Sequence, residues 1–282
     1  MKKLLTALVV LSVIAGGIYW VVQAATDKLD SILPDLQQCT AVAGEYEARF
    51  DPEQMGNAAV ITALGLKRGL PARAATIAIA TAIQESKLYN ISHGDRDSLG
   101  LFQQRPSMGW GTEEQVQDPV YATNKFYDAL VKIEGYEDMV VTEAAQEVQR
   151  SAYPEAYADH EGEGRAIASA ISGYSPAALT CRIDEPEAGS GKPQATKTEV
   201  NQLLGQMVGR ARVDGTTVVI PVDAGETGQR NGWAVAHYVL ARASEFGATS
   251  IAYDGRTWSA GKDEEWADTP KATGDQIVVT LA

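Results

Sequence analysis

The segment between residues 71 and 87 constrains the fold more than any other part of the chain. After Pro71, which suits the first position of a helix, the residues are almost free of charge on every face until Glu85. A helix that is apolar all round is a buried helix. The pattern therefore predicts a buried helix over 71–87, with Glu85 in its last turn, where the core meets a polar, glycine-marked loop.

Two effects at this position oppose the ionisation of Glu85. The apolar helix partly desolvates its carboxylate, and the negative end of the helix dipole lies nearby. We therefore expect a raised pKa for Glu85. A carboxylic acid that keeps its proton near neutral pH is what general-acid cleavage of a glycosidic bond requires. On spacing alone, the alternative is that Glu85 is a solvated residue that ends a helix.

The N-terminus has the pattern of an export sequence. Lys2 and Lys3 precede an uncharged run over residues 4–22, and Val22-Gln23-Ala24 resembles a cleavage site. The run is nearly long enough to span a bilayer, so residues 1–25 are either a signal peptide or a membrane anchor. In both cases the positive flank stays inside and the rest crosses the membrane. We expect an extracytoplasmic protein, secreted or held at the membrane by this helix.

The chain of 282 residues contains two cysteines, Cys39 and Cys181, and both lie in the exported part. Thiols oxidise in such compartments, so we expect one disulfide, with two unrelated buried thiols as the alternative. Loop-closure entropy gives such a bond roughly 4 to 5 kcal/mol of stabilisation. The net charge of -13 and pI near 4.7 argue against a nucleic-acid partner, which calls for a basic face.

Hydrophobic periodicity indicates an α+β protein with two parts. Residues 26–183 are predicted to form a mainly helical domain, with helices at 54–68, 71–87, 113–132, 142–158 and 165–171. The loop from 89 to 111 is long and rich in glycine, which is more often functional than idle. Residues 184–197 have the composition of a linker. Residues 198–282 are predicted to form a small α/β domain, with helices at 198–210 and 231–246, strands at 216–220, 249–253 and 276–281, and a strand-helix-strand crossover.

Several segments carry a family resemblance. Glu85-Ser86, followed by Gly100-Leu101-Phe102-Gln103, resembles the signature of the lytic transglycosylase and goose-type lysozyme group. The runs DSLGLFQQRPSMGWG, DPVYATNKFYDAL and AAQEVQRSAYPEAYA, within residues 51–161, resemble a transglycosylase-like domain of exported bacterial cell-wall proteins. The resemblance implies a lysozyme-like fold and cleavage of the MurNAc-GlcNAc β-1,4 bond in peptidoglycan glycan strands.

By the same resemblance, Glu85 corresponds to the catalytic acid and Gln103 to the glutamine of the cleft. Tyr153 or Tyr157 stands where the family places a cleft tyrosine, although the common Ala-Tyr-Asn form is replaced here by Ser-Ala-Tyr-Pro at 151–154. The predicted substrate-binding residues are Ser86, Phe102, Gln103, Trp110, Tyr153 and Tyr157.

Glycosidases usually use a second carboxylate, and Asp95 and Asp97 on the loop after Glu85 are the candidates. We include Asp97 with Glu85 as a catalytic candidate. If neither aspartate reaches the cleft, the resemblance implies a one-acid route: Glu85 protonates the leaving oxygen and then accepts the proton of the muramyl 6-hydroxyl, which yields a 1,6-anhydro sugar. Ordinary turn chemistry beside Gly94 is the alternative role for both aspartates.

Aromatic residues in and near the loop, namely Trp110, Phe102 and Tyr89, would give sugars flat surfaces. Arg105 and Asn124 are possible hydrogen-bond donors. The alternative is that the rings pack the loop onto the helices. His93 has no partner at metal-site spacing, so the sequence predicts neither a metal nor a cofactor.

The tail resembles an α/β module found at the C-terminus of exported cell-wall proteins, through the pieces NGWAVAHYVLARASEFG and IAYDGRTWSAG. Members of that group often carry Asp-His-Val-His in the last strand, where this chain has Asp-Gln-Ile-Val at 275–278. We therefore expect a non-catalytic module that binds the wall or an envelope protein, with His237 as a satisfied, half-buried residue. The alternative for the whole chain is a catalytically weak peptidoglycan-binding or scaffold protein of an envelope or secretion apparatus.

Overall fold

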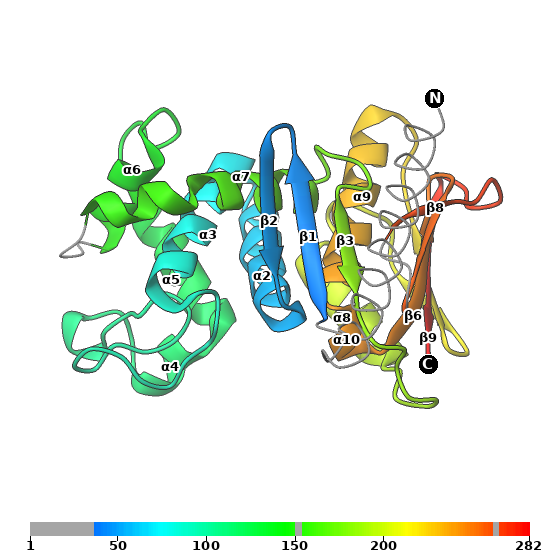
Figure 1. Ribbon diagram of the computed structural model, residues 1–282, viewed down its shortest axis with the longest axis horizontal. Helices are drawn as coiled ribbons and strands as arrows, with labels where there is room; N and C mark the ends of the chain where they lie inside the picture. Colours follow the sequence, from blue (N-terminus) through cyan, green and yellow to red (C-terminus); the bar gives the residue numbers. More distant parts are fainter. Residues whose placement is uncertain (1–36, 150–153, 262–264) are drawn as a thin grey trace, which may run out of the picture. The chain divides into compact units, whose positions relative to one another are not determined.

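The computed structural model describes residues 37–149, 154–261 and 265–282 (Figure 1). The predicted signal or anchor helix at 1–25 and the candidate Tyr153 lie outside these ranges. Among the helices that are described, none has both the length and the apolar character that a membrane span needs. Residues 37–282 pack as one compact unit of mixed α+β structure with two sheets.

A small antiparallel sheet stands at the start of the described chain. Strands β1 (Gln38–Ala43) and β2 (Tyr46–Phe50) form a hairpin, and β3 (Leu179–Arg182) pairs with the other edge of β1, which gives the order β2-β1-β3. The sequence analysis missed these strands. Cys39 and Cys181 face each other across β1 and β3 and form the predicted disulfide, which is confirmed.

The helices between the two cysteines are α2 (Pro52–Lys67), α3 (Ala72–Ser86), α4 (Glu113–Gln117), α5 (Pro119–Leu130), α6 (Val141–Gln149) and α7 (Glu161–Ile171), with 3-10 turns at Pro106–Met108 and Pro154–His160. Helices α2 and α3 begin and end within two residues of the predicted bounds. The segment predicted as one helix over 113–132 is two, because Asp118 ends α4 and its side chain caps α5, where Pro119 takes the first position.

Helix α3 is the buried helix that the sequence predicts. It packs against α2, α5, α6 and α7, and its residues from Ala74 to Ile83 are all buried. In Figure 1, α3 lies among the green helices, and the small blue and green sheet lies between these helices and α9. The two ends of α3 carry its charged residues, Arg73 and Glu85.

The remaining elements are α8 (Pro193–Leu203), β4 (Arg212–Asp214), β5 (Thr217–Pro221), α9 (Glu226–Ala241), α10 (Ala243–Phe246), β6 (Ala248–Tyr253), β7 (Arg256–Ser259), β8 (Ala267–Asp268) and β9 (Gln276–Leu281). The strands form an antiparallel sheet in the order β4-β5-β9-β6-β7-β8. Strands β5 and β6 both pair with β9, so they run in the same direction, with α9 connecting them. The strand-helix-strand order was predicted, but the insertion of β9 between the two strands was not.

The tail packs onto the part that precedes it. Helix α9 contacts α2, α7 and β3. The indole N–H of Trp258 donates to the Cys181 carbonyl at 2.8 Å, and that of Trp266 donates to the Leu179 carbonyl at 2.8 Å. The predicted linker at residues 184–197, between a first and a second domain, therefore stays a prediction from the sequence. In the structure the segments before and after it pack together in one compact unit.

Candidate active site

The end of α3 is set by two residues in the left-handed backbone region. Lys87 and Leu88 have φ values of 55° and 62°, and the N–H groups of both reach back to carbonyls in the last turns of the helix. This conformation is uncommon for residues other than glycine, and here the burial of the Leu88 side chain holds it in place. The helix stops abruptly, and Glu85 stands in its last turn.

The Glu85 carboxylate is half-buried and receives two side-chain hydrogen bonds. The Tyr157 hydroxyl donates to Oε1 at 2.7 Å, and the Gln149 side chain also bonds to the carboxylate. Burial raises the pKa of Glu85 above its ordinary value of 4.5, although both hydrogen bonds lower it. The direction agrees with the sequence-based expectation, and its cause is desolvation.

Glu85 opens onto a groove of about 610 Å³, within the range of small-ligand sites. The groove is lined by the end of α3, the loop over 103–110, the end of α5 with the residues after it, and α6. Its polar lining consists of Glu85, Gln103, Arg105, Lys132, Glu147 and Gln149. Its apolar lining includes Met108, Trp110, Ile133 and Val148. Of the residues predicted from sequence, Glu85, Gln103, Arg105 and Trp110 meet here.

Two glycines allow close packing in this loop, Gly94 against the Gln103 side chain and Gly100 against the backbone of α4. A Cβ atom on Gly94 would lie 1.9 Å from the Gln103 side-chain oxygen, and one on Gly100 would lie 2.2 Å from the Val116 carbonyl. Gly100 also has a φ of 77°, which favours glycine. Leu99 and Gln104 exchange backbone hydrogen bonds at 3.1 Å and close the turn that presents Gln103 to the groove.

Asp97 holds the loop rather than facing the groove. Its carboxylate accepts hydrogen bonds from the Ser107 backbone N–H at 2.7 Å, from the Ser107 hydroxyl at 2.9 Å and from Arg105 Nε at 3.0 Å. The bonds from Ser107 and then Arg105 hold the pKa of Asp97 far below its usual range. The structure thus gives Asp97 the turn role that the sequence left open, and the ion pair positions Arg105 in the groove wall.

Several predicted contact residues lie outside the groove. Phe102 is fully buried and stacks on Phe126 with ring centroids 4.8 Å apart. Ser86 is buried, with its hydroxyl 2.8 Å from the Leu101 carbonyl, where it ties the loop to α3. Tyr157 is buried as well, and it reaches Glu85 through its hydroxyl alone. These residues support the site from the core side.

Two weaker sequence candidates also lie elsewhere. Tyr89 donates its hydroxyl hydrogen bond to Asp51 at the start of α2. Asn124 accepts a hydrogen bond from Arg68 at 3.2 Å and lines a different cavity.

Sequence reasoning missed Gln149, whose side-chain amide contacts both Glu85 of α3 and the loop at Phe102. Besides bonding to Glu85, Gln149 Nε2 donates to the Phe102 carbonyl at 2.7 Å. Glu147, Lys132 and Met108 were missed as well. The signal for Gln149 and Glu147 was present in the run AAQEVQ, because α6 is amphipathic and exposes only part of its surface.

His237 differs from its predicted half-buried state, because α9 places it fully inside the core. Its Nδ1 donates to the Ala170 carbonyl at 2.6 Å, and its Nε2 has no partner among the described residues. Within the same residues, no group of three or more histidine, cysteine, aspartate or glutamate side chains could hold a metal ion. No protein-family model matches the chain, and no curated protein shows significant similarity to it.

Proposed function

We propose that the chain cleaves the glycan strand of peptidoglycan outside the cytoplasm, with Glu85 as general acid and then general base. The observation that carries the proposal is a half-buried glutamate with a raised pKa that lines a groove of about 610 Å³. An acid of this kind holds its proton until the leaving oxygen needs it. The disulfide supports an oxidising, extracytoplasmic location.

The geometry favours the one-acid route. Glu85 donates its proton to the glycosidic oxygen as the bond from that oxygen to the anomeric carbon breaks. The muramyl 6-hydroxyl oxygen then bonds to the anomeric carbon, and its proton passes to the Glu85 carboxylate. The glutamate ends in its starting state, no water is consumed, and the product is a 1,6-anhydro sugar. Asp97 is engaged by Ser107 and Arg105, which supports a route that does not use it, and Glu147 is the other carboxylate of the described groove lining.

The surroundings of Glu85 suit both halves of this cycle. Burial favours the protonated acid before the first transfer. The hydrogen bonds from Tyr157 and Gln149 stabilise the carboxylate that the first transfer leaves behind. In the groove, Trp110 offers a flat apolar surface for a sugar ring, and Arg105 and Lys132 offer positive charge to the carboxylates of the peptide stems.

Replacing the acid tests this function. The full chain should release soluble anhydro-muropeptides from sacculi, and Glu85→Gln should lower the rate by about 10²- to 10⁴-fold, the usual contribution of general acid–base catalysis. Mass spectrometry of the products measures both rate and product type. Glu143→Gln, an exposed residue of α6 outside the groove lining, is the matched control and should keep full activity. A reducing-end product would exclude the one-acid route.

The same variant has a stability signature. Because the pKa of Glu85 is raised in the folded state, its contribution to stability is complete below its ordinary value of 4.5 and is lost as pH rises through the folded pKa. Glu85→Gln should therefore raise Tm at pH 8 relative to wild type by more than it does at pH 4. If wild type and variant are equally inert on several wall chemistries while sacculi still bind, the scaffold function replaces the enzymatic one.

A further inference from the structure

A second groove, of about 390 Å³, lies at the opposite end of α3 from Glu85. It is formed by the β1–β2 turn, the first turn of α3, helix α7 and the loop that follows α7. Arg73, at this end of α3, is twelve residues from Glu85, which is about 18 Å along a helix axis. The residues that give this groove its chemistry are Tyr46, Arg73, Arg165, Ser169, Tyr174 and Ser175.

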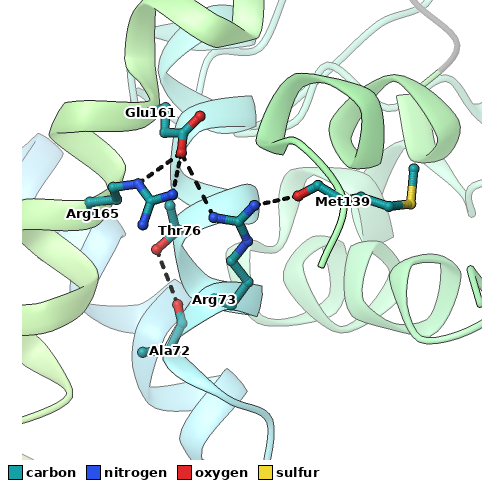
Figure 2. Close-up of polar contacts among 6 residues, drawn as sticks. All are labelled: Ala72, Arg73, Thr76, Met139, Glu161 and Arg165. Carbon is teal, nitrogen blue, oxygen red and sulfur yellow. Dashed lines mark hydrogen bonds and ion pairs between the residues drawn. The ribbon is translucent and has the colours of Figure 1, made fainter. Parts of the chain in front are cut away.

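The charge of this groove is opposite to that of the chain. Its lining within the described residues includes two arginines and no carboxylate, although the chain carries a net charge of -13. Figure 2 shows how the two arginines share one partner: both point toward a single oxygen of Glu161. Arg165 Nε donates to this oxygen at 2.7 Å, and Arg73 Nη1 lies 3.7 Å from it. One carboxylate balances one of the two charges.

Contacts around Arg73 and Arg165 hold them in place. Arg73 also donates to the Met139 carbonyl, which ties it to the segment before α6 (Figure 2). The Arg73 and Arg165 side chains are 21% and 38% exposed, so each keeps part of its surface accessible. Guanidinium groups fixed in this manner are suited to carboxylate or phosphate oxygens, because little side-chain entropy remains to be lost on binding.

Two exposed tyrosines, Tyr46 and Tyr174, line the groove together with the arginines. The Arg165 guanidinium carbon lies 5.9 Å from the centre of the Tyr46 ring, and that of Arg230 lies 5.0 Å from the centre of the Tyr174 ring. Tyr46 and Tyr174 are 38% and 58% exposed, so both rings are accessible to a ligand in the groove. The hydroxyls of Ser169 and Ser175, 2.9 Å apart, add hydrogen-bonding groups beside them.

We propose that this groove binds an anionic glycan, whose carboxylate or phosphate groups pair with Arg73 and Arg165 and whose sugar rings lie on Tyr46 and Tyr174. Sugars combine apolar ring faces with many hydroxyls, which matches tyrosine faces beside serine hydroxyls. An acidic peptide such as oligoglutamate would satisfy the arginines and offer the two tyrosine rings no apolar ring face. The proposal does not depend on the chemistry at Glu85.

Calorimetric titration of the full chain tests the proposal. The probes are an oligosaccharide of alternating uronic acid and N-acetylhexosamine, the same compound with its carboxylates reduced to alcohols, a hexosamine oligomer joined by phosphodiesters, and an oligoglutamate peptide. We expect binding of the uronate or the phosphodiester compound that weakens with salt, and no binding of the reduced compound. Which of the two anionic compounds binds identifies the charged group.

Variants separate this groove from others. Arg165→Gln should weaken binding by about tenfold, the value of one charge-assisted contact, and Tyr174→Ala should weaken it as well. Arg49→Gln removes an exposed arginine of β2 that does not line the groove and should have no effect. Calorimetry measures binding and needs no turnover, so failure of the enzymatic proposal leaves this test intact. Absence of binding to both anionic glycans, an unaffected Arg165→Gln variant, or stronger binding of oligoglutamate would overturn the proposal.

Discussion

Burial shifts the pKa values of Glu85 and His237 in the directions that favour their neutral forms, yet the two groups lie in different surroundings. Burial raises the pKa of Glu85, and it lowers the pKa of His237 to about 4. Glu85 is half-buried at the wall of a groove, whereas His237 is fully enclosed. Burial shifts the pKa of both groups, but only Glu85 lies beside a groove from which a ligand could exchange a proton with it.

The side chains around Glu85 and His237 also differ: those at Glu85 are hydrogen-bond donors, and those at His237 are mostly aromatic. Glu85 accepts hydrogen bonds from Tyr157 and Gln149, which stabilise its charged form. His237 lies among indole rings, with centroids 5.3 Å from Trp233 and 6.1 Å from Trp266. Helix α7 joins the two regions, because it packs along α3 and its Ala170 carbonyl accepts the hydrogen bond from His237.

The largest expected effect comes from removing the disulfide, because it weakens both regions together. Strand β3, which carries Cys181, contacts both α7 and α9. The two cysteines are 142 residues apart, so replacing both by serine should lower the free energy of unfolding by about 4–5 kcal/mol. Denaturant titration measures this loss. Alkylation of two thiols in the native, unreduced protein would show that the bond is absent.

The next largest effect concerns His237, which should make the free energy of unfolding fall as the pH is lowered. The folded pKa of about 4 lies below the ordinary value of 6.5, so the unfolded state binds a proton more readily between these values. The stabilisation is present above pH 6.5 and is lost as pH falls through 4. The difference between pH 7 and pH 4 amounts to about 3 kcal/mol.

His237→Phe should remove this acid sensitivity. A phenyl ring keeps the contacts with the indoles, and the Ala170 carbonyl still accepts a hydrogen bond from the Gly173 N–H at 2.9 Å. Unfolding titrations of wild type and variant at pH 7 and pH 4 give the difference. Equal slopes for wild type and His237→Phe would contradict an enclosed neutral ring.

A smaller effect is expected for Tyr157→Phe, which removes one donor from Glu85 and leaves the ring in the core. The carboxylate form then loses a hydrogen bond, so the pKa of Glu85 rises further. The rate of muropeptide release should fall by about tenfold, and the alkaline limb of its pH profile should move to higher pH. Tyr127→Phe removes a buried hydroxyl bonded to the Ile61 carbonyl away from the groove and should leave the profile unmoved. A profile unchanged by Tyr157→Phe would show that this hydrogen bond does not tune the acid.

The local sequence pattern predicted the helices that carry Glu85 and His237 better than it predicted how these helices pack with the strands. The apolar run before Glu85 predicted a buried helix with a raised glutamate pKa, because both depend on neighbours within a few turns. Strand β3 was missed, since its pairing with β1 joins residues about 140 positions apart, and the local hairpin of β1 and β2 was missed as well. The same limit explains His237, whose full burial depends on α7 and on Trp266 from a distant strand region.

Within the site, residue type was enough to predict Glu85 as the candidate acid, but it did not predict which neighbouring side chains line the groove. Phe102 and Trp110 are both aromatic residues of one loop, yet Phe102 stacks in the core and Trp110 lines the groove. Which ring turns inward depends on Phe126 of α5, which sequence spacing does not place. Gln149 was missed because the amphipathic pattern of α6 marks an exposed face and does not reveal that this amide contacts Glu85 and the Phe102 carbonyl.

The smallest effect is expected for Glu147→Gln, which tests whether Glu85 acts alone or needs a second carboxylate. Glu147 is exposed on α6 and is the other carboxylate in the described lining of the groove. A hydrolase that activates water would need such a second group, whereas the one-acid route does not. Glu147→Gln should therefore change the rate of muropeptide release by less than about threefold, a difference below 1 kcal/mol. A loss comparable to that of Glu85→Gln, with a reducing-end product in the wild type, would assign Glu147 as the base and replace the anhydro route by hydrolysis.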